Sequence, residues 1–199
     1  MIETKTHANV AVAVYQQGKN GSSWCGDGYI TIETDSYFLC ALADGLGSGE
    51  NAARSSELAM EAVKKNQDES VPVMLEACNK ALAEERGVVI TILKAYFDSN
   101  TLAYGNVGNI ATYLFPPGEE MKRPIPTTGY LSGRKYKYRM EYYPFQSGFH
   151  FVMHSDGIQI PRSDQQWMNR IISPHTSIKQ LEKHAKQDDD VTVLIGQVT

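Results

Sequence analysis

The stretch ADGLGSGENAA at residues 43–53 joins three kinds of local pattern. It follows an apolar run at residues 37–43, which is typical of a buried strand. Its three alternate glycines favour a tight loop, and beyond them small and apolar residues recur at helical spacing to about residue 65. The sequence therefore predicts, in direct succession, a strand that ends in an aspartate, a glycine-rich loop and a helix.

Outward from this stretch, the pattern predicts hairpin-linked strands with one helical pair in the middle and another near the end. Strands are expected at residues 10–15, 29–32, 37–43, 88–97, 101–107, 110–115, 136–143, 149–154 and 191–197, and helices at 52–65, 71–86, 163–172 and 177–186. Residues 116–133, rich in proline and glycine, are expected to form a long irregular excursion of the kind that often borders a site. This order favours the α+β class, with two packed sheets covered by helices.

Composition limits the function classes. Hydrophobic residues make up 42% and charged residues 21% of the 199 residues, so we expect residues 1–199 to fold as a single domain. The net charge of -4 argues against nucleic-acid binding, which usually requires clustered lysine and arginine residues. The polar start is unlike a signal peptide, and no run approaches the roughly 20 apolar residues that cross a bilayer. We therefore expect a cytoplasmic protein with neither nucleic acid nor a membrane as partner.

The three cysteines, Cys25, Cys40 and Cys78, are odd in number and contain no CxxC pair. This pattern suits a reducing compartment and offers neither a disulfide framework nor a thiolate zinc site. Buried free thiols are the expected state.

Aspartates stand where predicted strands begin or end, at Asp27, Asp44, Asp156 and the run DDD at 188–190. Any one Asp-Gly pair is first of all a turn signal. Two of these aspartates, however, follow core-like runs, and rigid strand ends can aim several carboxylates at one point. Convergence on one site is therefore the hypothesis.

Converging carboxylates need cations, because each like-charge pair about 4 Å apart costs on the order of 4 kcal/mol at an effective dielectric near 20. All-oxygen ligands without neighbouring thiolates favour Mg²⁺ or Mn²⁺. Two such ions roughly 3.5 to 4 Å apart can hold a hydroxide and clamp a phosphoryl group. Hydrolysis of a phosphate ester is the expected chemistry.

The motifs ADGLGSGENAA at 43–53, HSDG at 154–157 and DDVT at 189–192 resemble the signatures of the PPM (PP2C-like) metal-dependent protein phosphatases. The resemblance covers nearly the whole chain. The length, together with CGD, GNVGN and GYLSG, is most similar to the short bacterial branch acting in sporulation and stress signalling. The resemblance implies a central sandwich of two antiparallel sheets, helices on both outer faces and a dimetal site at one end.

Carried over by position, the resemblance implies that Asp44 bridges both ions, with the Gly45 carbonyl on one and Asp156 and Asp189 on the other. Asp27 fills the first acidic motif, as a ligand either directly or through water. This chain has Gly26 where many relatives have a second acid, and it has no clear counterpart of the arginine that binds substrate phosphate in larger relatives. Backbone amides of residues 47–49 are an alternative anion site.

The expected function is that of a monomeric phosphoserine and phosphothreonine phosphatase, acting by attack of a dimetal-bound hydroxide. The resemblance implies phosphorylated stressosome scaffold proteins (RsbS- and RsbR-like) as substrates, with negative feedback in the general stress response. A catalytically silent phosphoprotein-binding module of the same fold is the alternative. A nucleotide-dependent enzyme is disfavoured, because the glycine-rich loop has neither GxGxxG spacing nor a Walker lysine.

Other polar residues leave alternatives open. No histidine is assigned to catalysis, and His154 is expected to pack or hydrogen-bond near the site. Asn106 and Asn109 either satisfy turn backbone groups or support the metal ligands. The alternating basic run Arg134, Lys135, Lys137 and Arg139 suggests a solvated face, with docking of an acidic phosphoprotein as the alternative.

Overall fold

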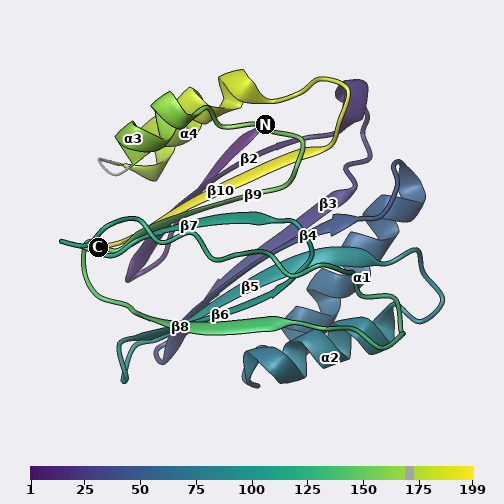
Figure 1. Ribbon diagram of the computed structural model, residues 1–199, viewed down its shortest axis with the longest axis horizontal. Coiled ribbons are helices and arrows are strands. Elements are labelled where there is room, and N and C mark those ends of the chain that lie inside the picture. The colour runs from purple at the N-terminus through teal and green to yellow at the C-terminus, as the bar shows by residue number, and fades with distance from the viewer. Residues whose placement is uncertain (169–172) are drawn as a thin grey trace.

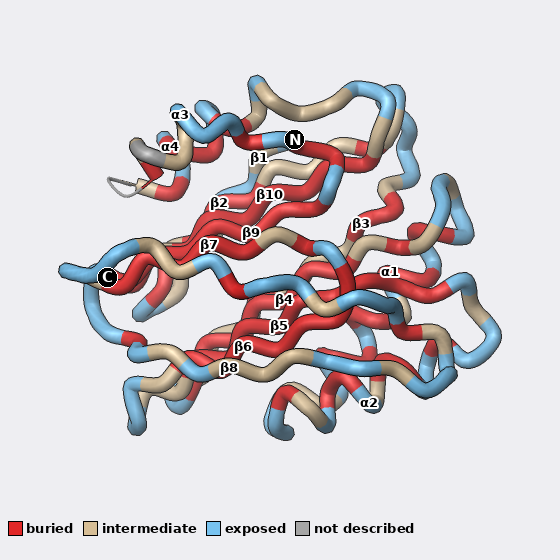
Figure 2. The backbone as a smooth tube through the Cα atoms, viewed as in Figure 1, coloured by how far each residue is buried: buried red, intermediate tan, exposed pale blue. Residues whose placement is uncertain are grey.

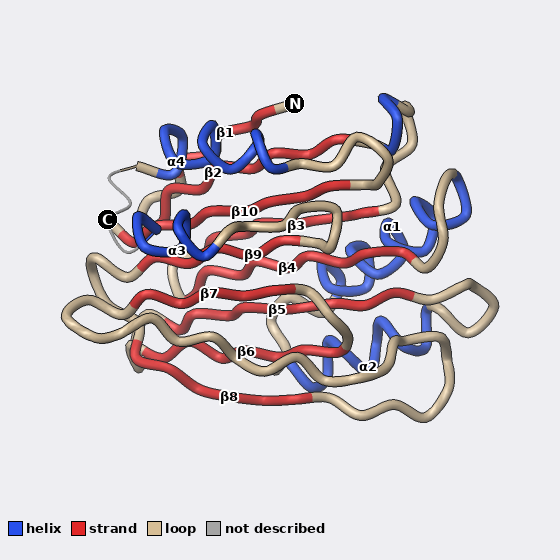
Figure 3. The backbone as a smooth tube through the Cα atoms, turned by 45° about the horizontal axis from the view of Figure 1, so that its top comes forward, coloured by secondary structure: helices blue, strands red, loops and turns tan. Residues whose placement is uncertain are grey.

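Two five-stranded antiparallel sheets face each other in the computed structural model, which describes residues 1–168 and 173–199 (Figure 1). The first sheet has the order β1 (Ile2–Thr6), β2 (Val10–Gln17), β10 (Val191–Val198), β9 (His150–His154) and β7 (Ala111–Phe115). The second has the order β3 (Asp27–Glu33), β4 (Tyr37–Gly45), β5 (Val88–Tyr96), β6 (Thr101–Val107) and β8 (Arg139–Pro144). The strands of both sheets lie roughly along one common axis, so the connecting loops gather at the two ends of the sandwich (Figure 3).

Helices cover both outer faces (Figure 1). The helices α1 (Glu50–Lys65) and α2 (Val71–Ala81) pack on the second sheet, while α3 (Arg162–Met168) and α4 (Pro174–Leu181) lie over the first. Short 3₁₀ turns occur at η1 (Lys19–Gly21) and η2 (Glu182–His184). The predicted α+β class, a sandwich of two antiparallel sheets flanked by helices on both faces, is confirmed.

Strand β4 shows why the central strands are apolar at every position. Successive side chains of a strand point to opposite faces. Phe38, Cys40 and Leu42 accordingly join the core between the sheets, and Leu39 and Ala41 join the core beneath α1 and α2. Figure 2 shows the resulting buried layers, with exposed backbone mainly at the loops and outer helices. Both faces of such a strand are core, which explains the continuous run that the sequence displays.

The element bounds differ from the predictions by more than two residues in four places. Strand β1 was missed, because its polar sequence IETKT forms an edge strand held by backbone pairing to β2. Helix α2 ends at Ala81 instead of 86, since residues 82–85 form turns before Gly87, with a φ of 105°, redirects the chain into β5. Strand β8 begins at Arg139 instead of 136.

The fourth difference concerns the C-terminal helices. The helix predicted at 177–186 is α4, which starts three residues earlier at Pro174 and gives way to η2. The helix predicted at 163–172 corresponds to α3, and its residues 169–172 lie outside the described residues.

The excursion at residues 116–133 is fastened to the sheets at three isolated bridges, Leu114 with Lys122, Gly108 with Thr127, and Val88 with Leu131. The Asn106 side chain adds to this, because its Oδ1 accepts a hydrogen bond from the Thr127 amide at 2.8 Å. The excursion is therefore held across the ends of β5 and β6 and reaches the loop end at which β4 delivers Asp44.

Among the described helices, none combines the length and apolar composition that crossing a membrane requires.

Candidate functional site

A pocket of ≈ 500 Å³ opens at the end of the sandwich where β4 and β9 finish. Its walls come from six separate parts of the chain: the end of β4 with the glycine-rich loop, the start of β5, the β6–β7 turn, the 116–133 excursion, the loop after β9 and the loop before β10. The lining residues are Asp44, Gly45, Leu46, Gly47, Val89, Gly108, Asn109, Pro126, Thr127, Thr128, Gly129, Asp156, Asp189 and Asp190. Four carboxylates therefore share one cavity, and the predicted excursion forms part of its rim.

Asp44 is placed by the packing of the strand-loop-helix unit. It lies at the end of β4, paired in register with Asp27 of β3. The next residue has to be a glycine, because a Cβ at Gly45 would lie only 2.1 Å from the Ala52 carbonyl oxygen in α1. This close approach holds the first turns of α1 against the end of β4 and fixes where the Asp44 carboxylate can point.

Asp27 lies beside this pocket and does not line it; it lines a second cleft, between β3 and α1. Its side chain is buried, and its Oδ2 accepts a hydrogen bond from the Ser155 hydroxyl at 2.7 Å. The Ser155 oxygen in turn accepts from the Thr192 amide at 3.0 Å. Asp27 therefore ties the second sheet to the first at the site, while its Oδ1 has no hydrogen-bond partner in the described part of the protein.

Asp156 is held by neighbours from other elements, and Asp189 by the residue next to it. The Asn109 side-chain amide donates to Asp156 Oδ2 at 3.2 Å, and Lys186 Nζ donates to the Asp156 carbonyl at 2.9 Å. Asp189 Oδ1 accepts from the Asp190 amide at 3.0 Å. These contacts bring the predicted Asp156 and Asp189 to the same cavity as Asp44 and Gly45.

The crowding of negative charge shows in the pKa values of the carboxyls. Burial, followed by the charges of Asp27, Asp156, Asp189 and Asp190, raises the pKa of Asp44 to about 8 from an ordinary value of 3.8. The pKa of Asp27 is also raised, by burial first and by neighbouring carboxylates second. A site that penalises its own charges in this way gains from a bound cation.

The donor set fits divalent cations that prefer oxygen. All the converging side chains offer carboxylate oxygens, and the unpartnered Oδ1 of Asp27 is a further acceptor. No three His, Cys, Asp or Glu side chains in residues 1–168 and 173–199 are grouped tightly enough to enclose an ion by themselves. The carboxylates surround the pocket, so an ion there also needs backbone oxygen or water, as Mg²⁺ commonly does.

Comparison with known proteins places this geometry in a family. Residues 34–199 match the family model described as Stage II sporulation protein E (SpoIIE). The chain belongs to the SpoIIE family of PP2C-like phosphatases. It is 34% identical to the phosphoserine phosphatase RsbX of Bacillus subtilis (strain 168) over 201 residues, covering the whole of both chains.

Solved structures agree with the SpoIIE-family assignment. A crystal structure of RsbX in complex with magnesium superposes with a TM-score of 0.93 at 33% identity and covers 100% of both chains. A chain from work on the bacterial stressosome, a modular system adapted to control secondary messenger signalling, superposes with a TM-score of 0.85 at 25% identity. It covers 94% of this chain and 99% of that one. RsbX therefore shares the entire sandwich, including the end that carries the acidic pocket.

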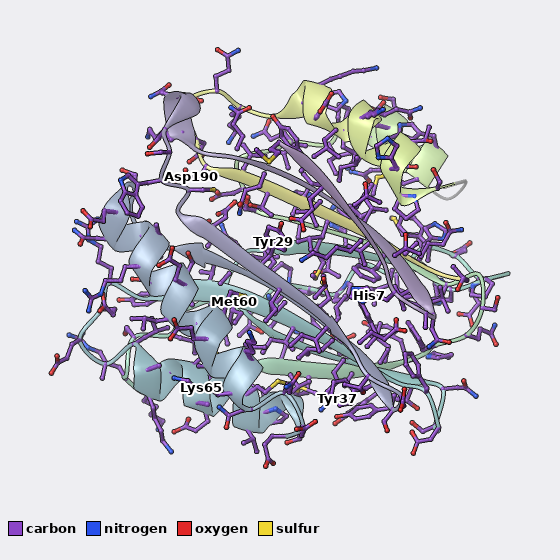
Figure 4. The ribbon with its side chains drawn as sticks, turned by 180° about the vertical axis from the view of Figure 1, so that it is seen from behind. His7, Tyr29, Tyr37, Met60, Lys65 and Asp190 are labelled. Carbon is purple, nitrogen blue, oxygen red and sulfur yellow. The ribbon has the colours of Figure 1, made fainter. Side chains whose placement is uncertain are left out.

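Sequence reasoning did not select Asp190, the third residue of the acidic run. Asp190 lies in the loop beside η1, and its Oδ1 accepts a hydrogen bond from the Lys19 amide at 2.9 Å (Figure 4). A Cβ at Gly26 would lie 2.7 Å from Asp190 Oδ2. Asp190 thus fills the space beside Gly26. The run of three aspartates was the available signal, but sequence alone does not show which one meets Gly26.

Arg86 is a second residue that the sequence did not point to. Its Nη1 would lie 2.6 Å from a Cβ built on Gly47, so the guanidinium rests directly on that glycine at the pocket wall. Gly47 has a φ of 101°, which favours glycine for backbone reasons as well. The Leu46 amide donates to the Gly87 carbonyl at 2.9 Å and holds the two segments together. This juxtaposition arises from packing and has no sequence motif.

The open questions about polar residues are answered by their contacts. His154 lies on β9, where its Nδ1 is 2.7 Å from the Ser155 carbonyl oxygen and its ring stacks on Tyr113. Burial lowers the pKa of His154, so it is a packed neutral residue. Asn106 fastens the excursion, whereas Asn109 contacts Asp156. Cys40 and Cys78 are buried and Cys25 is half-buried, all three as free thiols.

Proposed function

We propose that this chain is a metal-dependent phosphoserine and phosphothreonine phosphatase of RsbX type, acting in bacterial stress signalling. The observation that carries the proposal is the single pocket that collects Asp44, Asp156 and Asp189 from distant parts of the sequence. Support comes from the full-length likeness to RsbX, a phosphoserine phosphatase solved with magnesium. Residues 1–199 are proposed to work as one phosphatase domain.

Within the pocket, we assign Asp44, Asp156, Asp189 and the Gly45 carbonyl as ligands of two Mg²⁺ or Mn²⁺ ions. Asp44 lies at the end of β4, between Asp27 of β3 and Val89 of β5, and would be the carboxylate shared by the two ions. Asp27 lies outside the pocket and accepts a hydrogen bond from Ser155. This position favours contact with an ion through water, or support of the neighbouring metal ligands. Its unpartnered Oδ1 is the atom available for that role.

Bound divalent ions supply Lewis acidity that polarises the phosphoryl oxygens and makes a neighbouring water acidic enough to attack phosphorus. The chain's part is to position that group. The Gly47 segment and the Arg86 guanidinium lie on one side of the pocket, where donors and positive charge suit phosphate oxygens. Pro126 to Gly129 also line the pocket, and this rim limits how a protein substrate approaches.

We propose phosphorylated stressosome scaffold proteins, RsbS- and RsbR-like, as the substrates. The support is the likeness to RsbX and to a chain studied within the stressosome. Removal of phosphate from such proteins gives the negative feedback expected of this class, and a monomer is sufficient for it.

A silent phosphoprotein-binding module remains the second candidate, because the carboxylates surround the pocket without enclosing an ion in the described part of the chain. This candidate predicts tight binding of a phosphopeptide with neither turnover nor Mn²⁺ uptake. The enzymatic proposal predicts both turnover and uptake.

The test is Mn²⁺-dependent phosphate release from a phosphoserine peptide. We expect Asp44→Asn and Asp156→Asn to lower kcat by roughly 100-fold or more, because each removes a carboxylate from the ions that carry the chemistry. Asp35→Asn, on an exposed turn outside the pocket, is the matched control and should leave kcat unchanged. Full activity of both pocket variants in the presence of EDTA would refute the enzymatic proposal.

A further inference from the structure

A third cleft, of ≈ 410 Å³, continues from the acidic pocket along the chain towards β8. It is lined by Thr128, Gly129, Tyr130, Ser132, Arg134, Lys135, Tyr136 and Lys137, and is called the basic groove below. The basic groove shares Thr128 and Gly129 with the acidic pocket. A ligand can therefore place one part in the pocket and a neighbouring part in the groove.

The charge of the groove is opposite to that of the pocket. Arg134, Lys135 and Lys137 are exposed, and none of them forms an ion pair with a described residue. Glu76, which meets the groove at the Tyr136 hydroxyl, forms an ion pair with Lys80. On a chain with a net charge of -4, three unpaired cations beside the four carboxylates of the acidic pocket form a strong local contrast.

The backbone beneath these cations is fixed. Asn79 of α2 is buried, and its Oδ1 accepts hydrogen bonds from the amides of Ser132 at 3.1 Å and Gly133 at 3.0 Å. Its Nδ2 donates to the Arg134 carbonyl at 3.0 Å. The backbone pairing of Val88 with Leu131 holds the start of the same segment. A prearranged set of charges loses less entropy on binding than charges on a loose loop would.

We propose that the basic groove binds acidic residues that flank the phosphoserine of the protein substrate. This inference rests on the proposed phosphatase function and specifies its substrate class. Without its ions the acidic pocket repels an acidic peptide. With or without the ions, the unpaired cations of the groove attract acidic residues that lie beside the phosphoserine. An extended peptide advances about 3.3 Å per residue, so positions within a few residues of the phosphoserine reach the adjoining groove.

Two phosphoserine peptides test the proposal, one with three acidic residues beside the phosphoserine and one with the same residues replaced by their amides. We expect the wild-type protein to hydrolyse the acidic peptide with a higher kcat/KM than the amide peptide, mainly because the KM for the acidic peptide is lower. The charge-reversal pair Lys135→Glu and Lys137→Glu should lower kcat/KM for the acidic peptide by ~10-fold and leave hydrolysis of p-nitrophenyl phosphate unchanged. The matched control is Lys64→Glu with Lys65→Glu, at the exposed end of α1, which should alter neither.

Binding provides a readout independent of turnover. In a protein carrying Asp44→Asn, fluorescence anisotropy should show that the acidic peptide binds more tightly than the amide peptide. This preference should disappear when Lys135→Glu and Lys137→Glu are added. Binding of the acidic peptide should also weaken between 50 mM and 500 mM salt. Equal kinetics and binding of the two peptides, or equal binding of an RNA oligonucleotide or anionic vesicles, would overturn the groove proposal while the phosphatase proposal stood. No hydrolysis of any substrate would instead refute the phosphatase function itself.

Discussion

At Asp44 two structural requirements coincide. The β4 backbone must end in a residue whose carboxylate faces the pocket, and the following Gly45 must leave room for the Ala52 carbonyl of α1. Beside the pocket, the hydrogen bonds of Ser155 with Asp27 and Thr192 join the two sheets. Each acidic side chain is therefore placed by packing that would exist for structural reasons alone, and the chemistry depends on that packing.

Arg86 is the residue whose role is most easily tested. Its guanidinium rests on Gly47 at the pocket wall, so truncation removes positive charge without touching a carboxylate. We expect Arg86→Ala to raise KM for a phosphoserine peptide by ~10-fold, because a charge-assisted hydrogen bond contributes about 1.5–3 kcal/mol. Mn²⁺ affinity, measured by calorimetry, should stay unchanged.

The control for Arg86 is Arg54→Ala, on α1, whose side chain pairs with Glu85. Loss of Mn²⁺ binding in Arg86→Ala would show that the arginine supports the metal ligands and would contradict a role in phosphate binding. An unchanged KM would contradict any contact with substrate.

The residue types at the site were readable from the sequence, but their partners were not. Asp44, Asp156 and Asp189 stand in motifs at strand ends, and the structure places all three on one pocket. Asp190 and Arg86 depend on contacts with Gly26 and Gly47, residues far away in sequence. Such contacts follow from how sheets and helices pack, which local spacing does not encode.

Among the elements, the loop between β9 and α3 packs closely against the start of β10. A Cβ at Gly157 would lie 2.0 Å from the Asp190 carbonyl oxygen and 2.7 Å from Val191. Gly157→Ala must therefore push the Asp156 loop away from the start of β10. We expect Mn²⁺ affinity to fall roughly 10- to 100-fold and the free energy of unfolding to fall by about 1–3 kcal/mol, as measured by calorimetry and urea unfolding.

The control for Gly157 is Gly118→Ala, in an exposed turn with a φ of 76° and no atom within 4 Å of the added Cβ. It should lose stability from its backbone conformation alone and keep its Mn²⁺ affinity. If Gly157→Ala binds Mn²⁺ as tightly as the control, the coupling of this loop to the site is wrong.

The elements themselves were predictable where side-chain pattern determines them. Strands β5, β6 and β7 differ from the predicted ranges by one residue or less at each end, because their apolar runs are bounded by turn residues. Strand β1 has no such pattern, since an edge strand can be held by backbone hydrogen bonds whatever its side chains. The end of α2 depends on the turn that leads into β5, and the helical spacing simply continues past it.

At the scale of the whole molecule, the two sheets bring their acidic loops together at one end. The negative charges of these carboxylates repel one another and destabilise the folded state. Because the pKa of Asp44 is raised to about 8, the folded protein holds a proton between about pH 4 and 8 that the unfolded chain has released. Without metal, the free energy of unfolding should therefore decrease as the pH rises through this window. Protonation at the lower pH relieves the repulsion.

Thermal unfolding in EDTA at pH 5 and pH 8 measures this effect. We expect the Tm of the wild-type protein to fall between these values by roughly 10 °C more than that of Asp44→Asn, because the interval covers about three pH units of this window at about 1.4 kcal/mol each. Added Mn²⁺ should restore the wild-type Tm at pH 8. Parallel pH profiles for the two proteins would show that Asp44 carries no such penalty.

The central claim is that the fold collects distant carboxylates around two divalent ions, and anomalous diffraction from crystals soaked in Mn²⁺ tests it most directly. The account predicts two anomalous peaks, roughly 3.5 to 4 Å apart, within the pocket bounded by Asp44, Asp156 and Asp189. It also predicts that both peaks vanish in Asp44→Asn crystals. Peaks elsewhere on the molecule, or none in this pocket at saturating Mn²⁺, would contradict the account.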